Sequence, residues 1–181
     1  MLTDLPYSLT VDGQQREINC DFRDVILILN AFNDPELTQQ EKTMIMLTNL
    51  YVDDWTSFKD INEAVSQAVK FIDWGKEYSE KENSPRIMDW EQDYNLIISA
   101  VNTKISVIDI RELDFVHWWT FLGYFSERGE CQFSTFTEIR DNLNKGRPLE
   151  RWQKETLRNN RDQIILKHKS AEKFENELWG E

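Results

Sequence analysis

The chain has 181 residues and a net charge of −12, from 33 acidic and 21 basic side chains. Nucleic-acid binding depends on clustered Lys and Arg, so this balance argues against a nucleic-acid partner. The length suits one domain with a single hydrophobic core, in which seven Trp and ten Phe supply much of the apolar surface. Cys20 and Cys131 lack the paired spacing of a zinc or redox site, and we expect reduced thiols.

The charge is uneven along the chain. Residues 140–181 contain ten basic and eight acidic side chains, a balance of +2, which leaves −14 for residues 1–139. This pattern indicates two solvated surfaces, head-to-tail self-association, or an oppositely charged partner. No apolar run approaches the roughly 18 to 20 residues of a membrane span, and the N-terminus does not resemble a signal peptide. We therefore expect a cytoplasmic protein without a membrane partner.

A β-hairpin is predicted over residues 1–20. Residues 7–11 alternate apolar and polar side chains, and Asp12-Gly13 is a strong two-residue hairpin turn. Isolated hairpins are marginal in water, so this one must lie on the rest of the domain or pair with another chain.

Three amphipathic helices are predicted in the first half of the chain. Asp21 caps the first, which ends at 33–35, and Thr38 with Glu41 forms a capping box for the second. Ser57 with Asp60 begins the third. The apolar positions expected to face inward are Phe22, Val25, Ile26, Leu29, Phe32, Met44, Ile45, Leu47, Tyr51, Phe58, Ile61, Val65, Ala68, Val69 and Ile72. Gly75 is expected to end the third helix.

Residues 76–89 are polar and lack periodicity, so they predict a surface loop. Asp89 then caps a fourth helix that carries Ile97, Ile98 and Val101. A fifth helix is expected from Leu113 to near residue 129. Its most apolar face comprises Phe115, Trp118, Trp119, Leu122 and Phe125. A helix that is apolar nearly all round is expected in the core, with its Phe121 and Tyr124 side as a candidate partner-binding groove.

The C-terminal part is predicted to contain a short helix that carries Ile139 and Leu143 and ends at Gly146. A long terminal helix follows from Arg147-Pro148, with Trp152 on its apolar stripe as a further candidate partner-binding residue. Thr156 and Asn160 dilute that stripe, so the second half of the helix, residues 161–181, is expected to dock weakly or on another protein. Altogether the sequence predicts a mainly α fold, with six to seven helices in one domain over residues 1–181.

The sequence contains none of the common catalytic or cofactor-binding motifs. There is no phosphate-binding glycine loop, no HExxH or GxSxG motif, and no Cys/His cluster, so we expect neither an enzyme nor a cofactor. His117 could act as a base, but a structural histidine is the simpler interpretation. Asp53-Asp54, or Glu91 with Asp93, could bind Mg²⁺ or Ca²⁺ through oxygen, but helix capping is the commoner role of such carboxylates.

Residues 87–166 resemble the phage and prophage tail protein family named for gene product fifteen. The resemblance rests on four segments of this chain. They are Gln92-Asp93 with Ile97, Ile108-Asp109-Ile110, Val116-His117-Trp118-Trp119-Thr120-Phe121, and Phe133 or Phe136 with Ile139 and Arg140. The order of hairpin and helices at the start of the chain is also similar to the family.

The resemblance implies a non-enzymatic tail morphogenesis protein in the host bacterial cytoplasm. Its expected role is a tail assembly chaperone that binds the tape-measure protein and also the tail-tube protein, and it could form a homo-oligomer. It carries no catalytic residues with it; His117, Trp118, Trp119, Phe121, Asp93, Asp109 and Arg140 are expected to be mostly structural. The alternatives are a structural tail or connector subunit retained in the virion, an acidic protein-binding inhibitor, and a small metal-dependent hydrolase.

Overall fold

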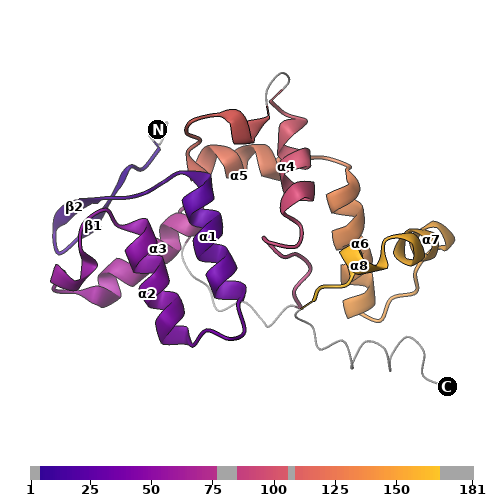
Figure 1. The fold of residues 1–181 in the computed structure, drawn as a ribbon, viewed down its shortest axis with the longest axis horizontal. Helices are drawn as coiled ribbons and strands as arrows, with labels where there is room; N and C mark the ends of the chain where they lie inside the picture. Colours follow the sequence, from indigo (N-terminus) through magenta and orange to yellow (C-terminus); the bar gives the residue numbers. More distant parts are fainter. Residues whose placement is uncertain (1–4, 77–84, 106–108, 168–181) are drawn as a thin grey trace. The chain divides into compact units, whose positions relative to one another are not determined.

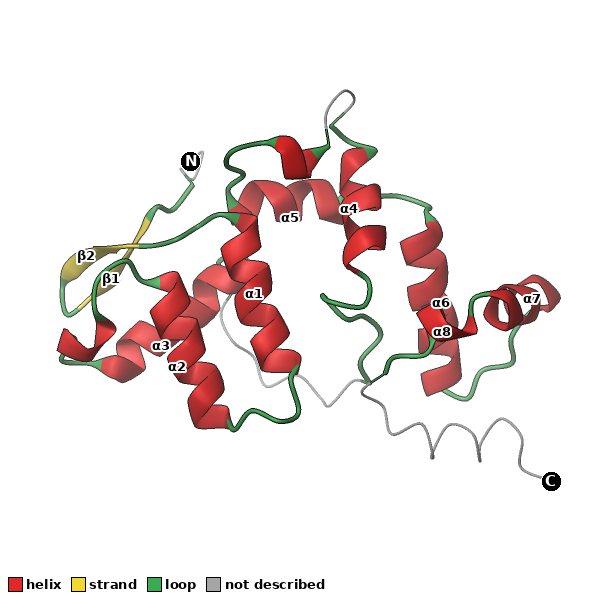
Figure 2. Cartoon of the chain, viewed as in Figure 1, coloured by secondary structure: helices red, strands yellow, loops and turns green. Residues whose placement is uncertain are grey.

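The structure is a computed structural model, and it describes residues 5–76, 85–105 and 109–167. Within these ranges the chain forms eight α-helices, two short 3-10 helices and one antiparallel hairpin (Figure 2). The mainly helical class and the N-terminal hairpin are therefore confirmed. The chain divides into two compact units: unit 1 is Met1–Glu82 with Val101–Arg128, and unit 2 is Asn83–Ala100 with Gly129–Glu181. The single-domain assignment stays a prediction.

The hairpin pairs β1 (Ser8–Val11) with β2 (Gln14–Glu17). Asp12 and Gly13 both have positive φ, 55° and 70°, which is the turn geometry that matches the twist of two paired strands. The Asp12 carboxylate accepts hydrogen bonds from two main-chain amides just before α3 (Ile61–Ile72), at 2.8 and 2.9 Å. The hairpin is thus fastened to the helices of unit 1.

The predicted caps of the first two helices are confirmed. Asp21 accepts from the main chain at the start of α1 (Phe22–Asn33). Thr38 and Glu41 form the reciprocal capping box of α2 (Gln39–Leu50). Figure 1 shows α1, α2 and α3 side by side in unit 1, and direct packing links α1 with α2 and α2 with α3.

Two details of this region differ from the sequence prediction. Trp55–Ser57 is a separate 3-10 helix, so Asp60 rather than Ser57 begins α3. On α2 the inward side chains include Met46 and Leu50, whereas Met44 is 47% exposed. Leu47 and Tyr51 are buried as predicted, so the buried face of α2 is broader than its apolar spacing indicates and does not include Met44.

Unit 1 is completed by the 3-10 helix η2 (Ile110–Glu112) and by α5 (Trp118–Ser126). The predicted fifth helix is therefore too long at its start, because residues 113–117 are not helical. Helix α4 (Tyr94–Asn102) follows the turn that Asp89 stabilises.

Unit 2 contains most of α4 together with α6 (Gln132–Asn144), α7 (Arg151–Asn159) and α8 (Arg161–Ile164). Its core includes Phe136, Ile139 and Ile164, with partly buried leucines packed around them.

The single long terminal helix is not what the described residues form. The helix breaks at Asn160 (φ −128°, ψ 30°), and the chain becomes extended at Ile165. Residues 168–181 of the predicted extension, and residues 77–84 of the predicted loop, lie outside the described residues. In the part of the chain that is described, no helix is long and apolar enough to cross a bilayer.

Candidate functional site

The segment before α5 is held in an extended conformation by residues 20–22. Phe22 donates its main-chain N–H to the Val116 carbonyl at 3.0 Å, and Trp118 donates to the Cys20 carbonyl at 2.7 Å. The Asp21 carboxylate, which also caps α1, accepts the Val116 N–H at 2.9 Å. These long-range bonds replace the helical bonds that the local pattern predicted, which explains why α5 begins only at Trp118.

His117 is the N-cap of α5. Its Nδ1 accepts the main-chain N–H of Trp119 at 3.0 Å, so the ring proton lies on Nε2, which donates to the Pro6 carbonyl oxygen at 2.9 Å. The side chain is 3% exposed, and burial lowers the pKa of the imidazole below its ordinary value of 6.5. Both nitrogens are engaged with the main chain, which supports the structural interpretation of this histidine.

The two tryptophans of the motif bind the C-terminal end of α3. Trp118 donates its indole N–H to the Ile72 carbonyl and Trp119 donates to the Phe71 carbonyl, both at 2.9 Å. Carbonyls in the last turn of a helix have no partner within the helix, so the Trp118 indole supplies a donor to Ile72. The Trp119 indole adds a second donor to Phe71, whose carbonyl also accepts the Trp74 N–H at 3.2 Å. The chain leaves α3 through Gly75 (φ +74°), where an added Cβ would lie 3.2 Å from the Trp119 ring.

Phe121 does not open to a partner as predicted. It is 0% exposed and stacks on Phe22 (ring centroids 4.7 Å apart) and on Trp118 (5.6 Å). Tyr124 is half-buried. The side of α5 that was predicted to form a partner groove therefore contributes Phe121 to the core of unit 1.

An exposed pair of rings lies on the other side of the motif. Tyr7 (54% exposed) and Phe115 (50% exposed) stack with their centroids 6.4 Å apart, and the Tyr7 ring meets the edge of His117 at 5.2 Å. We call Tyr7 and Phe115 the aromatic patch. Sequence reasoning missed it, because Tyr7 was assigned to the alternating pattern of a strand and Phe115 to the buried face of a helix.

In unit 2, the structure brings Asp93 and Arg140 together. The Arg140 guanidinium uses all five donors: it forms a bidentate pair with Asp93 at 2.6 and 2.8 Å, and donates to the carbonyls of Ile87, Gln163 and Ile164 at 3.0, 2.7 and 2.6 Å. Both charged side chains are at most 4% exposed. A buried charge requires such complete pairing.

Gln92, beside Asp93, binds the main chain of the segment from Gln163 to Lys167, to which Arg140 also donates. Its amide nitrogen donates to the carbonyls of Gln163 and Ile165 at 3.0 and 2.9 Å, and its oxygen accepts the Lys167 N–H at 3.0 Å. The Asp89 amide donates to Asp93, and Arg86 pairs with the Asp89 carboxylate. The segment after α8 is therefore fixed through its main chain.

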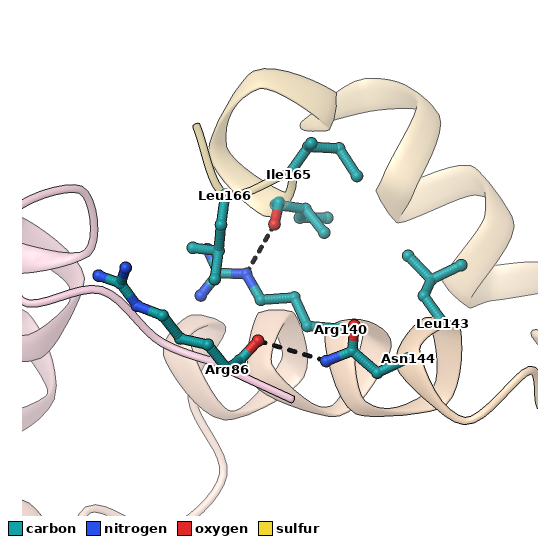
Figure 3. A pocket seen from close by; sticks show the side chains of 7 residues that line it. Arg86, Arg140, Leu143, Asn144, Ile165 and Leu166 are labelled. Atoms are coloured by element: carbon teal, nitrogen blue, oxygen red, sulfur yellow. Dashed lines mark hydrogen bonds between the residues drawn. The ribbon is translucent and has the colours of Figure 1, made fainter. Parts of the chain in front are cut away.

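Figure 3 shows the hollow beside Arg140, with the Arg140–Ile164 bond and the bond from the Asn144 amide to the Arg86 carbonyl. The hollow has a volume of about 10 Å³, near the minimum that holds one water molecule. Its size does not suit a substrate or cofactor.

The remaining predicted residues lie apart from these clusters. Asp109 caps η2 and pairs with Arg111, whose hydrogen bonds hold the pKa of that carboxyl well below its ordinary range. Trp152 lies on α7 and is 45% exposed. Among the described residues, no group of three or more His, Cys, Asp or Glu is arranged to hold a metal ion, and Asp54 instead caps the 3-10 helix that begins at Trp55.

Comparison with protein families gives a match to the family described as Bacteriophage Gp15 protein, over residues 2–166. The matched range contains the Gln92-Asp93, Asp109, His117-Trp118-Trp119 and Arg140 positions on which the resemblance was based. Comparison with curated proteins and with solved structures gives no match.

Proposed function

This chain belongs to the bacteriophage Gp15 protein family, and we propose that it is a non-enzymatic tail assembly chaperone that binds the tape-measure protein of its phage. It would act in the host bacterial cytoplasm and leave before the tail is complete. The observation that supports binding most directly is the aromatic patch, Tyr7 and Phe115, two large rings that are half-exposed and stacked on one another.

The aromatic patch has the chemistry needed to cover an apolar helical stripe. Aromatic side chains contribute a large share of the binding free energy in many protein interfaces, and a long helical partner presents apolar residues at regular spacing. The net charge of −12 would keep a complex of two such proteins in solution.

The support beneath the aromatic patch is rigid. His117 binds the Pro6 carbonyl directly before Tyr7, and Asp21 binds the Val116 amide directly after Phe115. Both rings are therefore flanked by anchored main chain, so little conformational entropy remains to be lost on binding. In this proposal the family motif positions the binding surface and does not itself touch the partner.

Co-expression with the tape-measure protein of the same phage tests the proposal. The wild-type chain should keep that protein soluble and elute with it, whereas a Tyr7→Ser/Phe115→Ser variant should not. Leu27→Ser/Met44→Ser is the matched control, because these side chains have similar exposed fractions, 52% and 47%, and lie on α1 and α2.

If the wild-type chain forms no complex and does not raise the solubility of the tape-measure protein, the chaperone proposal is wrong. Purified virions give a second readout. Stoichiometric amounts of the chain in virions would instead assign it to the structural subunits of the tail or connector.

A further inference from the structure

Helix α7 presents a basic face whose three cationic side chains form no ion pair with a described residue. Arg151, Lys154 and Arg158 are three and four positions apart, so they lie along one side of the helix. All three are exposed and, within the described ranges, none forms an ion pair. The three line a shallow surface depression together with Glu155. This stripe stands out on a molecule whose net charge is −12.

An exposed tryptophan adjoins the stripe, and the inner face of the helix is anchored. Trp152 is 45% exposed, and its indole N–H donates to the Glu150 carboxylate at 2.7 Å. On the inner side, Gln153 is 2% exposed and donates to Glu138 at 2.9 Å, while Leu157 packs against the core of unit 2. Trp and Arg are the residue types that most often dominate binding free energy, so the outer face has the composition of an interface.

Unit 1 carries an exposed surface of opposite charge. Val52 is 54% exposed and is followed by the exposed carboxylates of Asp53 and Asp54. Asp53 also pairs with Arg16 at 3.2 Å, and the Arg16 side chain is only 19% exposed. The Val52 amide donates to the Glu17 carbonyl at 3.1 Å, which places a third exposed acidic residue beside them. Hydrogen bonds from Thr56 lower the pKa of Asp54, so its carboxylate stays charged. We call Glu17, Val52, Asp53 and Asp54 the acidic edge.

We propose that α7 of one copy docks on the acidic edge of a second copy. Trp152 would pack on Val52, and the stripe of Arg151, Lys154 and Arg158 would face the carboxylates. The two surfaces are different, so the contact is head-to-tail rather than self-complementary. Two molecules of net charge −12 repel one another, and α7 is a described surface at which this repulsion is locally reversed. The inference does not depend on the tape-measure protein.

Charge reversal in the full-length chain tests this contact. Sedimentation velocity should show that the mass of the wild-type chain rises with protein concentration and falls with added salt. Arg151→Glu/Arg158→Glu and Asp53→Lys/Asp54→Lys should each weaken association by roughly tenfold or more. Lys145→Glu/Arg147→Glu is the matched control, because it reverses two exposed basic residues outside α7 and should leave association unchanged.

Mixing the two reversed variants is the sharpest test. An equimolar mixture should associate again, since the reversed α7 of one variant meets the reversed acidic edge of the other. Far-ultraviolet circular dichroism checks that each variant is folded, and Trp152→Ser provides an uncharged disruption of the same contact. A wild-type chain that is monomeric at all concentrations would overturn the proposal. A mixture of the two variants that stays monomeric would also overturn it. The same holds if Arg151→Glu/Arg158→Glu abolishes binding to duplex DNA but leaves self-association intact.

Discussion

In unit 1 the motif side chains that donate to main-chain carbonyls are neutral: one imidazole and two indoles, on Pro6, Ile72 and Phe71. In unit 2 the corresponding donor is a buried guanidinium, and a carboxylate must accompany it. Removing one neutral donor in unit 1 costs a single hydrogen bond. Removing Asp93 or Arg140 in unit 2 leaves the other charge buried and unpaired, which costs much more. We therefore expect substitutions in the Asp93–Arg140 cluster to lower the free energy of unfolding more than substitutions of the neutral donors.

The largest effect is expected for Arg140→Met. It leaves the Asp93 carboxylate buried without its charge partner and should lower the free energy of unfolding by about 3–5 kcal/mol. Urea denaturation measures the loss, and Arg147→Met, at an exposed arginine, is the matched control. Asp93→Leu/Arg140→Met should recover only part of the stability, because the Ile87 and Ile164 carbonyls still lack a donor, whereas Gln163 keeps its bond from Gln92. A double variant no more stable than Arg140→Met would contradict this expectation.

A smaller effect is expected for Trp119→Phe, which removes one neutral donor from the end of α3 and keeps most of the ring. The loss should be about 0.5–1.5 kcal/mol, the net contribution of one hydrogen bond, because the Phe71 carbonyl still accepts the Trp74 N–H. Trp152→Phe removes an indole that binds an exposed carboxylate, and it should change stability by less than about 0.5 kcal/mol. Equal losses in the two variants would show that the Phe71 contact contributes nothing.

The smallest effect is expected from the pH dependence of His117. Burial lowers its pKa in the folded chain below the ordinary value of 6.5, so the unfolded chain binds the proton more readily. The contribution of His117 is thus complete above pH 6.5 and declines as the pH falls below it. His117→Asn keeps a capping acceptor but does not titrate. The free energies of unfolding of the wild-type chain and of His117→Asn would be measured from pH 8 to pH 5. The difference between the two free energies should become smaller as the pH falls.

The local signals in the sequence were sufficient for the elements that depend on neighbouring residues. The Asp12-Gly13 turn, the Asp21 cap and the Thr38–Glu41 capping box each involve residues at most a few positions apart. The start of α5 could not be predicted in this way, because Asp21 binds the Val116 amide from 95 positions away.

The clusters themselves required both the resemblance and the structure. The family pattern identified Asp93 and Arg140, but their pairing across 47 positions, and the Gln163–Lys167 segment that they fasten, have no local signature. The aromatic patch was missed because Phe115 fits the helical period of the residues after it, although its own segment is extended. The helical period of a sequence does not show whether a side chain such as Phe115 is exposed, because exposure depends on how the whole chain folds.

A paired measurement on two variants distinguishes the binding role of the aromatic patch from the structural role of the family motif. For Phe115→Ser and Trp119→Phe, the melting temperature and the affinity for the tape-measure protein would be measured on the same preparations. We predict that Phe115→Ser weakens binding roughly tenfold or more with an unchanged melting temperature, and that Trp119→Phe lowers the melting temperature with little change in affinity. The reverse pattern, a Phe115→Ser chain that melts early but binds normally, would contradict the account.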